Sequence, residues 1–389
     1  MNEQLGRNLN LWQRRLLIVG IVFLAAAIID GILHPQQFFR SYLLGYMFWT
    51  GLSLGCIAFL LLNYLTGGKW GLPVRRPLEA GVRTLPLMAL LLIPLLLGMH
   101  SLFVWTHKEI VASDPTLKLK SIYLNVPFFL GREAIYFLFW LWITYRLVHW
   151  SRELDRTGNV HYKQRLEHMA GWSLLAYGLT VTFFSIDWVM SLEAHWFSTI
   201  YGLIFIVMQV QAAIAFTILV TRVVGQYDPV DKTVTPARLN DLGNLLLTFV
   251  MLWAYLAFSQ FLIIWSGDLL NEIPYYVSRA GHGWALLALT LIILYFAVPF
   301  FLLLIKDLKR HSHTLARICA VVFLLNFCAL FWMIVPAFHP DGPRLYLLDV
   351  LLTLGIGGIW LAFYIWKLKS YPLLPLHDPD FPGVTQYGE

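Results

Sequence analysis

Long apolar segments are the feature of this sequence that most limits its possible folds. A helix needs about 20 apolar residues to cross the hydrocarbon core of a membrane. We predict ten membrane-spanning helices, at residues 16–33, 41–65, 84–105, 126–148, 168–190, 198–224, 242–266, 283–305, 316–338 and 346–368. The connections between them are too short to form a core of their own. The sequence therefore predicts a single all-α polytopic membrane domain over residues 1–370, followed by an extended tail at 371–389.

Composition supports this assignment and excludes several kinds of site. Hydrophobic residues make up 59% of the chain and charged residues only 13%, whereas soluble domains carry about 25% charge. All three cysteines lie in apolar segments, and the sequence has no CxxC or Cys/His cluster. We therefore expect no iron–sulfur cluster, attached haem or structural zinc bound by this chain. We interpret 16–33 as a retained first helix, because it continues apolar past the alanines that superficially offer a signal-peptidase site.

The distribution of lysine and arginine predicts the orientation. If the two termini share one side, most of the 28 Lys and Arg residues fall on that side. Cytoplasmic connections are enriched in these residues, so we expect both termini to be cytoplasmic. The net charge of +6 then needs no nucleic-acid partner.

Residues 185–202, between the fifth and sixth helices, concentrate ionisable and aromatic side chains. Asp187 falls near the outer end of the fifth helix, where a carboxylate is costly and is therefore a candidate for moving a proton. It could instead cap the next turn or pair with Arg132 for structural reasons. Glu193, His195 and Trp196 lie in the turn itself, and we interpret them mainly as turn and docking elements. Glu193 could also relay a proton.

Other polar residues in apolar segments extend the candidate proton path. Glu133 could reach into the bundle or could belong to a charge pair at headgroup level. His100 could be a proton carrier or a hydrogen-bonded histidine without a metal. Three residues of the seventh helix could hold a water file or a quinone head, or could join helices by hydrogen bonds: Tyr255, Ser259 and Gln260.

The segment D-L-L-N-E-I-P-Y-Y at 268–276 is acidic and aromatic, and it follows the seventh helix. We interpret Asp268 and Glu272 as part of an outer docking surface. The sequence contains no P-loop, dinucleotide fingerprint, G-x-S-x-G or H-E-x-x-H motif, so we predict no catalytic, cofactor-binding or metal-binding residues in this chain.

Five stretches carry a family resemblance when they are taken together. They are W-T-H-K-E-I-V-A-S-D-P (105–115), Y-L-N-V-P-F-F-L (123–130), S-I-D-W-V-M-S-L-E-A-H-W-F-S-T-I-Y-G (185–202), Y-L-A-F-S-Q-F-L-I-I-W-S-G-D-L (255–269) and E-I-P-Y-Y (272–276). This combination resembles the F subunit of bacterial alternative complex III, an NrfD-like integral membrane subunit of a quinol:electron-acceptor oxidoreductase. The resemblance covers essentially the whole membrane region.

The resemblance implies two four-helix bundles, helices 2–5 and 6–9, flanked by helices 1 and 10. It also implies a complex in the bacterial inner membrane, with a paralogous quinol-binding C subunit, an iron–sulfur B subunit, haem-c subunits and small membrane subunits. Quinol, haem c and iron–sulfur clusters would then be bound by these partners. The F subunit itself is expected to contribute a proton path and a scaffold.

Two other functions also fit the sequence. The chain could have a quinone site of its own, as the membrane subunits of some molybdopterin oxidoreductases do. It could also be a free-standing transporter, for which inverted repeats would be expected, and none is evident in the sequence.

Overall fold

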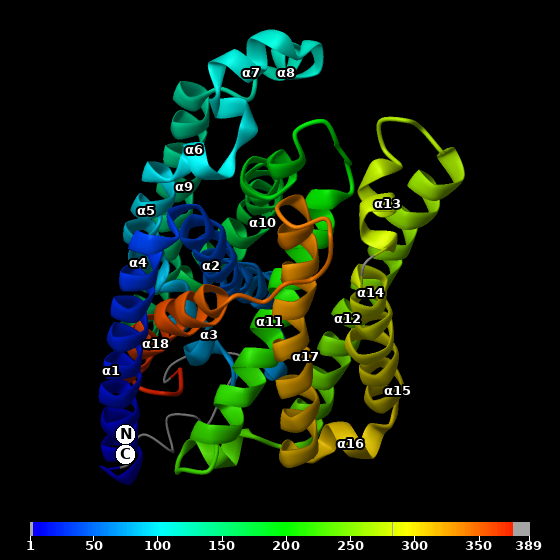
Figure 1. The fold of residues 1–389 in the computed structure, drawn as a ribbon. Coiled ribbons are helices and arrows are strands. Elements are labelled where there is room, and N and C mark those ends of the chain that lie inside the picture. Colours follow the sequence, from blue (N-terminus) through cyan, green and yellow to red (C-terminus); the bar gives the residue numbers. More distant parts are fainter. Residues whose placement is uncertain (1–2, 282, 376–389) are drawn as a thin grey trace.

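The computed structural model describes residues 3–281 and 283–375. Every regular element in these residues is helical, and ten spans are long and apolar enough to cross a membrane (Figure 1). Eight spans contain one long helix each: α1 (Glu3–Leu33), α2 (Pro35–Thr66), α9 (Val126–Thr157), α10 (Val160–Trp188), α11 (Tyr201–Val224), α12 (Pro236–Gly267), α17 (Ser312–Ile334) and α18 (Leu347–Lys369).

The third and eighth spans are broken into shorter pieces. The third consists of α3 (Arg75–Val82), α4 (Leu85–Leu91) and α5 (Ile93–Leu97), and the eighth of α14 (Trp284–Thr290), a π-helical segment η5 (Leu291–Ala297) and α15 (Val298–Leu304). The remaining short helices are η1 (Lys69–Gly71), α6 (Met99–Leu102), η2 (Val104–Thr106), α7 (Lys108–Ser113), α8 (Pro115–Lys120), η3 (Met190–Glu193), η4 (Val230–Thr233), α13 (Pro274–Ala280), α16 (Lys306–Arg310) and η6 (Val335–Ala337).

The spans form the two predicted bundles. α2, α3–α5, α9 and α10 pack together as the first bundle, and α11, α12, α14–α15 and α17 as the second. α1 and α18 pack along each other, and α18 packs against α2. α2 lies at the centre, since every residue from 41 to 61 is buried. The all-α polytopic fold is thus confirmed.

The third span begins earlier in the chain than the sequence predicts. Residues 75–82 were expected in a connection before a helix at 84–105, but they form α3, every residue of which is buried. Pro86 and Pro94 lie at the starts of α4 and α5, because proline lacks the N–H that continues a helix. Hydropathy detects the apolar part of a span and misses polar turns that continue it, so α1 and α12 also begin well before the predicted residues 16 and 242.

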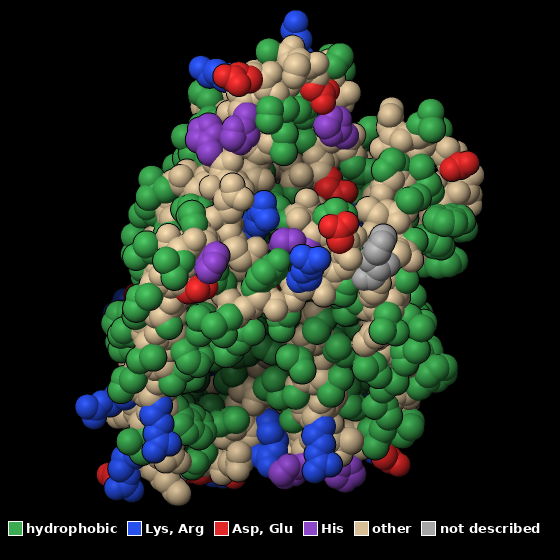
Figure 2. Space-filling view, viewed as in Figure 1, with side chains coloured by type: hydrophobic (Ala, Val, Ile, Leu, Met, Phe, Trp, Pro, Cys, Tyr) green, Lys and Arg blue, Asp and Glu red, His purple; other side chains and the backbone are tan. Residues whose placement is uncertain are grey.

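The molecule has two chemically different ends. We call the end at which α1 begins and α18 ends the basic side, and the opposite end, with α7, α8, α13 and the turn 189–200, the loop side. Figure 2 shows hydrophobic side chains around the middle and lysine and arginine gathered at the lower, basic side. This pattern is typical of a multi-pass membrane protein.

The beginning of the predicted tail is packed against the protein. Leu374 is buried, and the ring of Tyr371 lies beneath the guanidinium carbons of Arg152 and Arg83, at 3.8 and 4.5 Å from its centroid. Residues 376–389 of that tail lie outside the described part of the chain.

Candidate functional site

Asp187 forms a buried ion pair at the loop-side end of the first bundle. Its Oδ1 accepts from Nη2 of Arg132 at 2.7 Å, and its Oδ2 accepts from Nε at 3.0 Å and from the hydroxyl of Tyr136 at 3.1 Å. The aspartate side chain is completely buried, and that of Arg132 is 8% exposed. This is the Arg132 pairing that the sequence offered as the alternative to a proton-carrying role. A bidentate contact of this kind holds the carboxylate and the guanidinium group in one relative geometry.

Aromatic rings complete the surroundings of Arg132. Its guanidinium carbon lies 3.8 Å from the ring centroid of Tyr123 and 4.4 Å from that of Phe128. Its Nη1 also donates to the carbonyl oxygen of Tyr123 at 3.0 Å. Tyr123 belongs to the loop that precedes α9, so the ion pair anchors this loop to the bundle.

Glu133 follows Arg132 in sequence but points in a different direction. Successive residues on a helix differ by about 100°, and this turn takes the Glu133 carboxylate into the bundle, where the residue is 2% exposed. Neither carboxylate oxygen has a well-formed hydrogen bond to any described residue; the indole N–H of Trp188 lies near enough to interact with the carboxylate but does not complete one. The large majority of buried side-chain polar atoms have a partner, and Glu133 is the one carboxylate among the described residues that has both oxygens buried without one. Ordered water usually satisfies such groups.

Further polar groups follow Glu133 along the same bundle. Thr144 and Ser151 come three and five helical turns after Glu133, on the same buried face of α9. The hydroxyl of Thr144 has no hydrogen-bond partner among residues 3–281 and 283–375, and the same holds for Thr50 of α2 and Ser173 of α10. Three helices of the bundle therefore contribute buried hydroxyls that the described residues leave unpaired.

A second carboxylate lies at the basic-side end of this row. Oε1 of Glu79 accepts from the hydroxyl of Ser151 at 2.6 Å, and Oε2 accepts from Arg76. Arg76 also pairs with Asp155, whose side chain is 15% exposed. Ser151 and Glu133 are about 27 Å apart along the axis of α9 at 1.5 Å per residue, which is close to the thickness of the hydrocarbon core.

Sequence reasoning missed Glu79 because it assigned residues 66–83 to a connection. One signal could have found it. Arg76 and Glu79 have the spacing of a helical ion pair, and Pro77 follows two arginines at a position suited to the first turn of a helix.

The remaining predicted members of the proton path lie elsewhere. His100 is exposed in α6, just after the third span, with its ring 5.3 Å from that of His107. Tyr255 is 66% exposed on the outer surface of α12, and Ser259 is half-buried. Gln260 is buried and accepts from Ser198 at 2.9 Å. The three α12 residues belong to the second bundle. They are therefore separated from Asp187 and Glu133, which belong to the first bundle.

The turn between α10 and α11 is held by α13, the short helix between α12 and α14. Glu193 pairs with Arg279 of α13, and the ring of Trp196 stacks on that of Tyr275 with centroids 4.0 Å apart and planes 15° apart. Arg279 is 2% exposed. These contacts fasten the turn to α13, so Glu193 and Trp196 have structural partners within the chain.

The protruding α7–α8 segment holds the other side of the same turn. His195 Nε2 lies 2.6 Å from Asp114 Oδ2, and this hydrogen bond lowers the pKa of Asp114 below its ordinary value. Lys120 donates to the carbonyl oxygen of Ala194 at 2.6 Å, and burial lowers its pKa. His195 itself is largely exposed, as is Asp268 after α12. Glu272 is half-buried.

In the described part of the chain, no group of three or more His, Cys, Asp or Glu side chains is placed to hold a metal ion. No model of a known protein family matches the sequence, and no curated protein matches it either.

Proposed function

We propose that this chain is a membrane subunit of a quinol:electron-acceptor oxidoreductase, similar to the F subunit of alternative complex III, and that its first bundle carries protons across the membrane. Its role would be conduction and scaffolding, with the redox chemistry carried out by partner subunits. These partners would be a quinol-binding C subunit, an iron–sulfur B subunit, haem-c subunits and small membrane subunits.

The single observation that carries the proton path is the Glu133 carboxylate, which is buried with neither oxygen in a well-formed hydrogen bond to the part of the chain that the structure describes. A charged carboxylate in such a place is costly, so a group there is suited to taking up and releasing a proton. The hydroxyls of Thr50, Thr144 and Ser173, which have no partner among the described residues, could order water between Glu133 and the second carboxylate, Glu79.

Asp187 would act differently from Glu133 in this path. Both of its oxygens accept from Arg132, and the ion pair would lose its attraction if the carboxylate were protonated. We therefore assign proton transfer to Glu133. Asp187 would instead stabilise the loop-side end of the first bundle.

The bacterial inner membrane and cytoplasmic termini are part of this proposal. The excess of lysine and arginine at the basic side supports them. Protons would then enter or leave the cytoplasm near Asp155 and Glu79, and the opposite side near Glu133.

Co-isolation tests the assignment to a complex. The tagged chain, purified in mild detergent from its own organism, should carry with it iron–sulfur and haem-c subunits and give the absorption spectrum of c-type haem. Isolation of the chain alone, with no haem spectrum, would contradict the assignment.

Glu133→Gln tests the proton path, because the amide preserves the shape of the side chain and cannot carry a proton. In the complex reconstituted into vesicles, we expect the number of protons transferred per electron to fall while quinol oxidation continues. Glu79→Gln should have the same effect.

Glu167→Gln is the matched control, since this glutamate of α10 is exposed and should leave the proton-to-electron ratio unchanged. An unchanged ratio in Glu133→Gln would exclude Glu133 from the path.

A further inference from the structure

Three cationic side chains meet at the basic side, where the third span, α9 and α18 come together. Arg83 directly follows α3, Arg152 lies near the end of α9, and Lys367 lies in the last turn of α18. Nη1 of Arg83 donates to the carbonyl oxygen of Lys367 at 3.0 Å. The guanidinium carbons of Arg83 and Arg152 lie 4.5 and 3.8 Å from the ring centroid of Tyr371. We call Arg83, Arg152 and Lys367 the cation cluster.

The cation cluster has no anionic partner in the described part of the chain. None of its members forms an ion pair with a described carboxylate, and Nε of Arg152 is buried without a hydrogen-bond partner there. The charges of Arg83 and Arg152 repel each other, and both repel Lys367. Like charges repel more strongly where the dielectric constant is low. An anion that joined the cluster would therefore be bound favourably.

The carboxylates of the same region are already engaged by another arginine. Glu79 attracts Arg83, but its oxygens accept from Arg76 and Ser151. Asp155 also pairs with Arg76. One arginine thus holds both carboxylates, and the cation cluster keeps an excess of positive charge.

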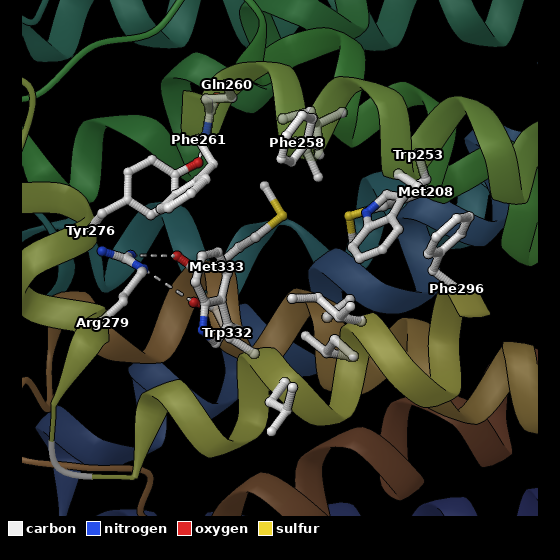
Figure 3. Close-up of a pocket in the computed structure, with 18 of the residues that line it drawn as sticks. Met208, Trp253, Phe258, Gln260, Phe261, Tyr276, Arg279, Phe296, Trp332 and Met333 are labelled. Atoms are coloured by element: carbon white, nitrogen blue, oxygen red, sulfur yellow. Dashed lines mark hydrogen bonds between the residues drawn. The ribbon is translucent and has the colours of Figure 1, made fainter. Parts of the chain in front are cut away.

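Arg279 of α13 shows how the same protein compensates a buried arginine. With Gln260 it lines a cavity of about 820 Å³ in the second bundle (Figure 3). Its Nη2 pairs with Glu193, and its Nε and Nη2 donate to two carbonyl oxygens of α17. The guanidinium group of Arg152, by contrast, donates to no acceptor among residues 3–281 and 283–375. Its N–H groups are therefore available to an external anion.

The cation cluster lies at the boundary between lipid and water. All three of its side chains are half-buried, so they can be reached from outside the bundle. Nζ of Lys367 lies 3.8 Å from the ring centroid of Trp366, which is 49% exposed. Exposed tryptophans are enriched at the interfaces of membranes.

An apolar face of the third span leads away from the cation cluster. Leu90, Ile93 and Leu97 follow Arg83 along this face and are 66%, 52% and 79% exposed, with the spacing of three or four residues that places side chains on one side of a helix. Arg83 and Ile93 are about 15 Å apart along the span at 1.5 Å per residue. This is half the thickness of the hydrocarbon core, so an acyl chain that begins at the cluster can follow this face through one leaflet.

We infer that the cation cluster binds the phosphodiester head of one anionic glycerophospholipid, whose acyl chains lie along the apolar face of the third span. The planar fork of an arginine matches the geometry of phosphate oxygens, and basic pockets between membrane helices bind phospholipid heads in this way. The excess of positive charge favours a lipid of net negative charge over a zwitterionic one. The inference depends neither on the proton path nor on the assignment to a complex.

Photolabelling with two lipids that differ only in the head tests this inference. The purified protein, with its co-isolated subunits, is placed in phosphatidylcholine nanodiscs. These contain a small fraction of phosphatidylglycerol with a diazirine on its acyl chain, or of phosphatidylcholine with the same acyl chain. Labelled peptides are identified by mass spectrometry. We expect phosphatidylglycerol to label α4, α5 and α18 at least about fivefold more than phosphatidylcholine does, and unlabelled phosphatidylglycerol to compete.

Single substitutions connect the label to the cation cluster. Arg152→Gln and Lys367→Gln each remove one charge, and each should weaken the labelling by phosphatidylglycerol about fivefold. Arg152→Lys keeps the charge and should retain most of the label, which separates the effect of charge from packing on Tyr371. If Arg152→Gln does not fold, Lys367→Gln decides.

Arg310→Gln is the matched control for the loss of one positive charge. This arginine ends α16, at the basic side of the second bundle, and it is exposed. The substitution should leave the label at the cation cluster unchanged.

Two other anions compete for the same cations, and the same assay detects them. Loss of the label in millimolar inorganic phosphate would assign the cluster to a free ion. The tail beyond the described residues contains Asp378 and Asp380, and both are replaced by Asn in the full chain. A preference for phosphatidylglycerol that appears only in this variant would assign the cluster to the tail. Either result would overturn the inference.

Equal labelling of α4, α5 and α18 by the two lipids would overturn it as well, and so would labelling that is unaffected by both Arg152→Gln and Lys367→Gln. The measured quantity is the binding of a lipid. Proton stoichiometry and co-isolation are measured separately, so failure here leaves the proposed function to be judged by its own experiments.

Discussion

At the residue scale, two neighbours on α9 have opposite surroundings. The carboxylate of Asp187 accepts from Nε and Nη2 of Arg132, whereas neither oxygen of Glu133 has a well-formed hydrogen bond to a described residue. The difference follows from the angle of about 100° between successive helical residues, which directs one side chain towards Asp187 and Tyr123 and the other into the bundle. A structural ion pair and a candidate proton carrier can therefore be adjacent in sequence.

The Arg132–Asp187 pair gives a prediction about stability. Arg132→Leu leaves a buried aspartate without its cation, and breaking a buried pair in this way costs about 3–5 kcal/mol. The double variant Arg132→Leu with Asp187→Leu removes both charges and should recover much of this loss. Thermal unfolding of the purified protein measures the difference.

The exposed pair Arg156–Glu153 on the same helix is the control for that measurement. Its arginine side chain is 71% exposed, and surface pairs contribute about 0–1 kcal/mol, so Arg156→Leu should change stability little. If the double variant at the buried pair is no more stable than Arg132→Leu, the ion pair does not explain the cost.

At the element scale, α1 is held to α18 by direct backbone contact. A Cβ placed on Gly358 would lie 2.6 Å from the Cα of Gly20, and one placed on Gly20 would lie 2.7 Å from the backbone nitrogen of Ile359. Small residues allow such close helix packing in membranes. This contact involves residues more than 300 positions apart, so the helical pattern of either segment alone does not reveal it.

The glycine contact predicts how α1 can be released. Gly358→Leu should push α1 away from α18, because backbone atoms cannot move aside as a side chain can. We expect faster proteolysis of α1 and a lower unfolding temperature for the purified protein.

Gly178→Leu on α10 is the matched substitution, since a Cβ there meets nothing within 4 Å. It should behave like the unmodified protein. Equal sensitivity of the two variants to protease would show that the close approach does not hold α1 in place.

At the scale of the whole molecule, the two ends differ in charge and in shape. α7 and α8 protrude from the loop side in Figure 1, and lysine and arginine gather at the basic side in Figure 2. A charge asymmetry of this kind favours one orientation of the protein in the membrane. The orientation determines which carboxylate of the proposed proton path faces the cytoplasm.

Cysteine labelling in intact cells measures this orientation. Ala112→Cys is exposed on the loop side and Gln226→Cys is exposed on the basic side. A membrane-impermeant maleimide should label Ala112→Cys in intact cells and Gln226→Cys only after permeabilisation. The unmodified protein, with Cys56 and Cys319 buried and Cys328 partly buried, is the background control, and the reversed pattern would contradict cytoplasmic termini.

The sequence by itself determined the membrane class, the number of spans and the approximate position of each. Membrane spans are recognisable because the lipid phase demands about 20 apolar residues whatever the neighbouring helices are. It also identified Asp187, Glu133 and Gln260 as polar residues whose place in a membrane span requires an explanation, because burying a polar side chain in the lipid phase is costly whichever way it points.

Only the tertiary structure decided what each of these groups does. The partners of Asp187 and Glu133 depend on which helices pack against α9, and Glu79 became part of the bundle because the third span begins at Arg75. The cavity beside Gln260 is lined by residues of α12 together with α13, α14, η5, α11 and α17, which are far apart in the sequence. Apolar residues satisfy the lipid phase in many arrangements, so hydropathy places helices in the membrane, and side-chain packing between distant segments determines the arrangement that forms.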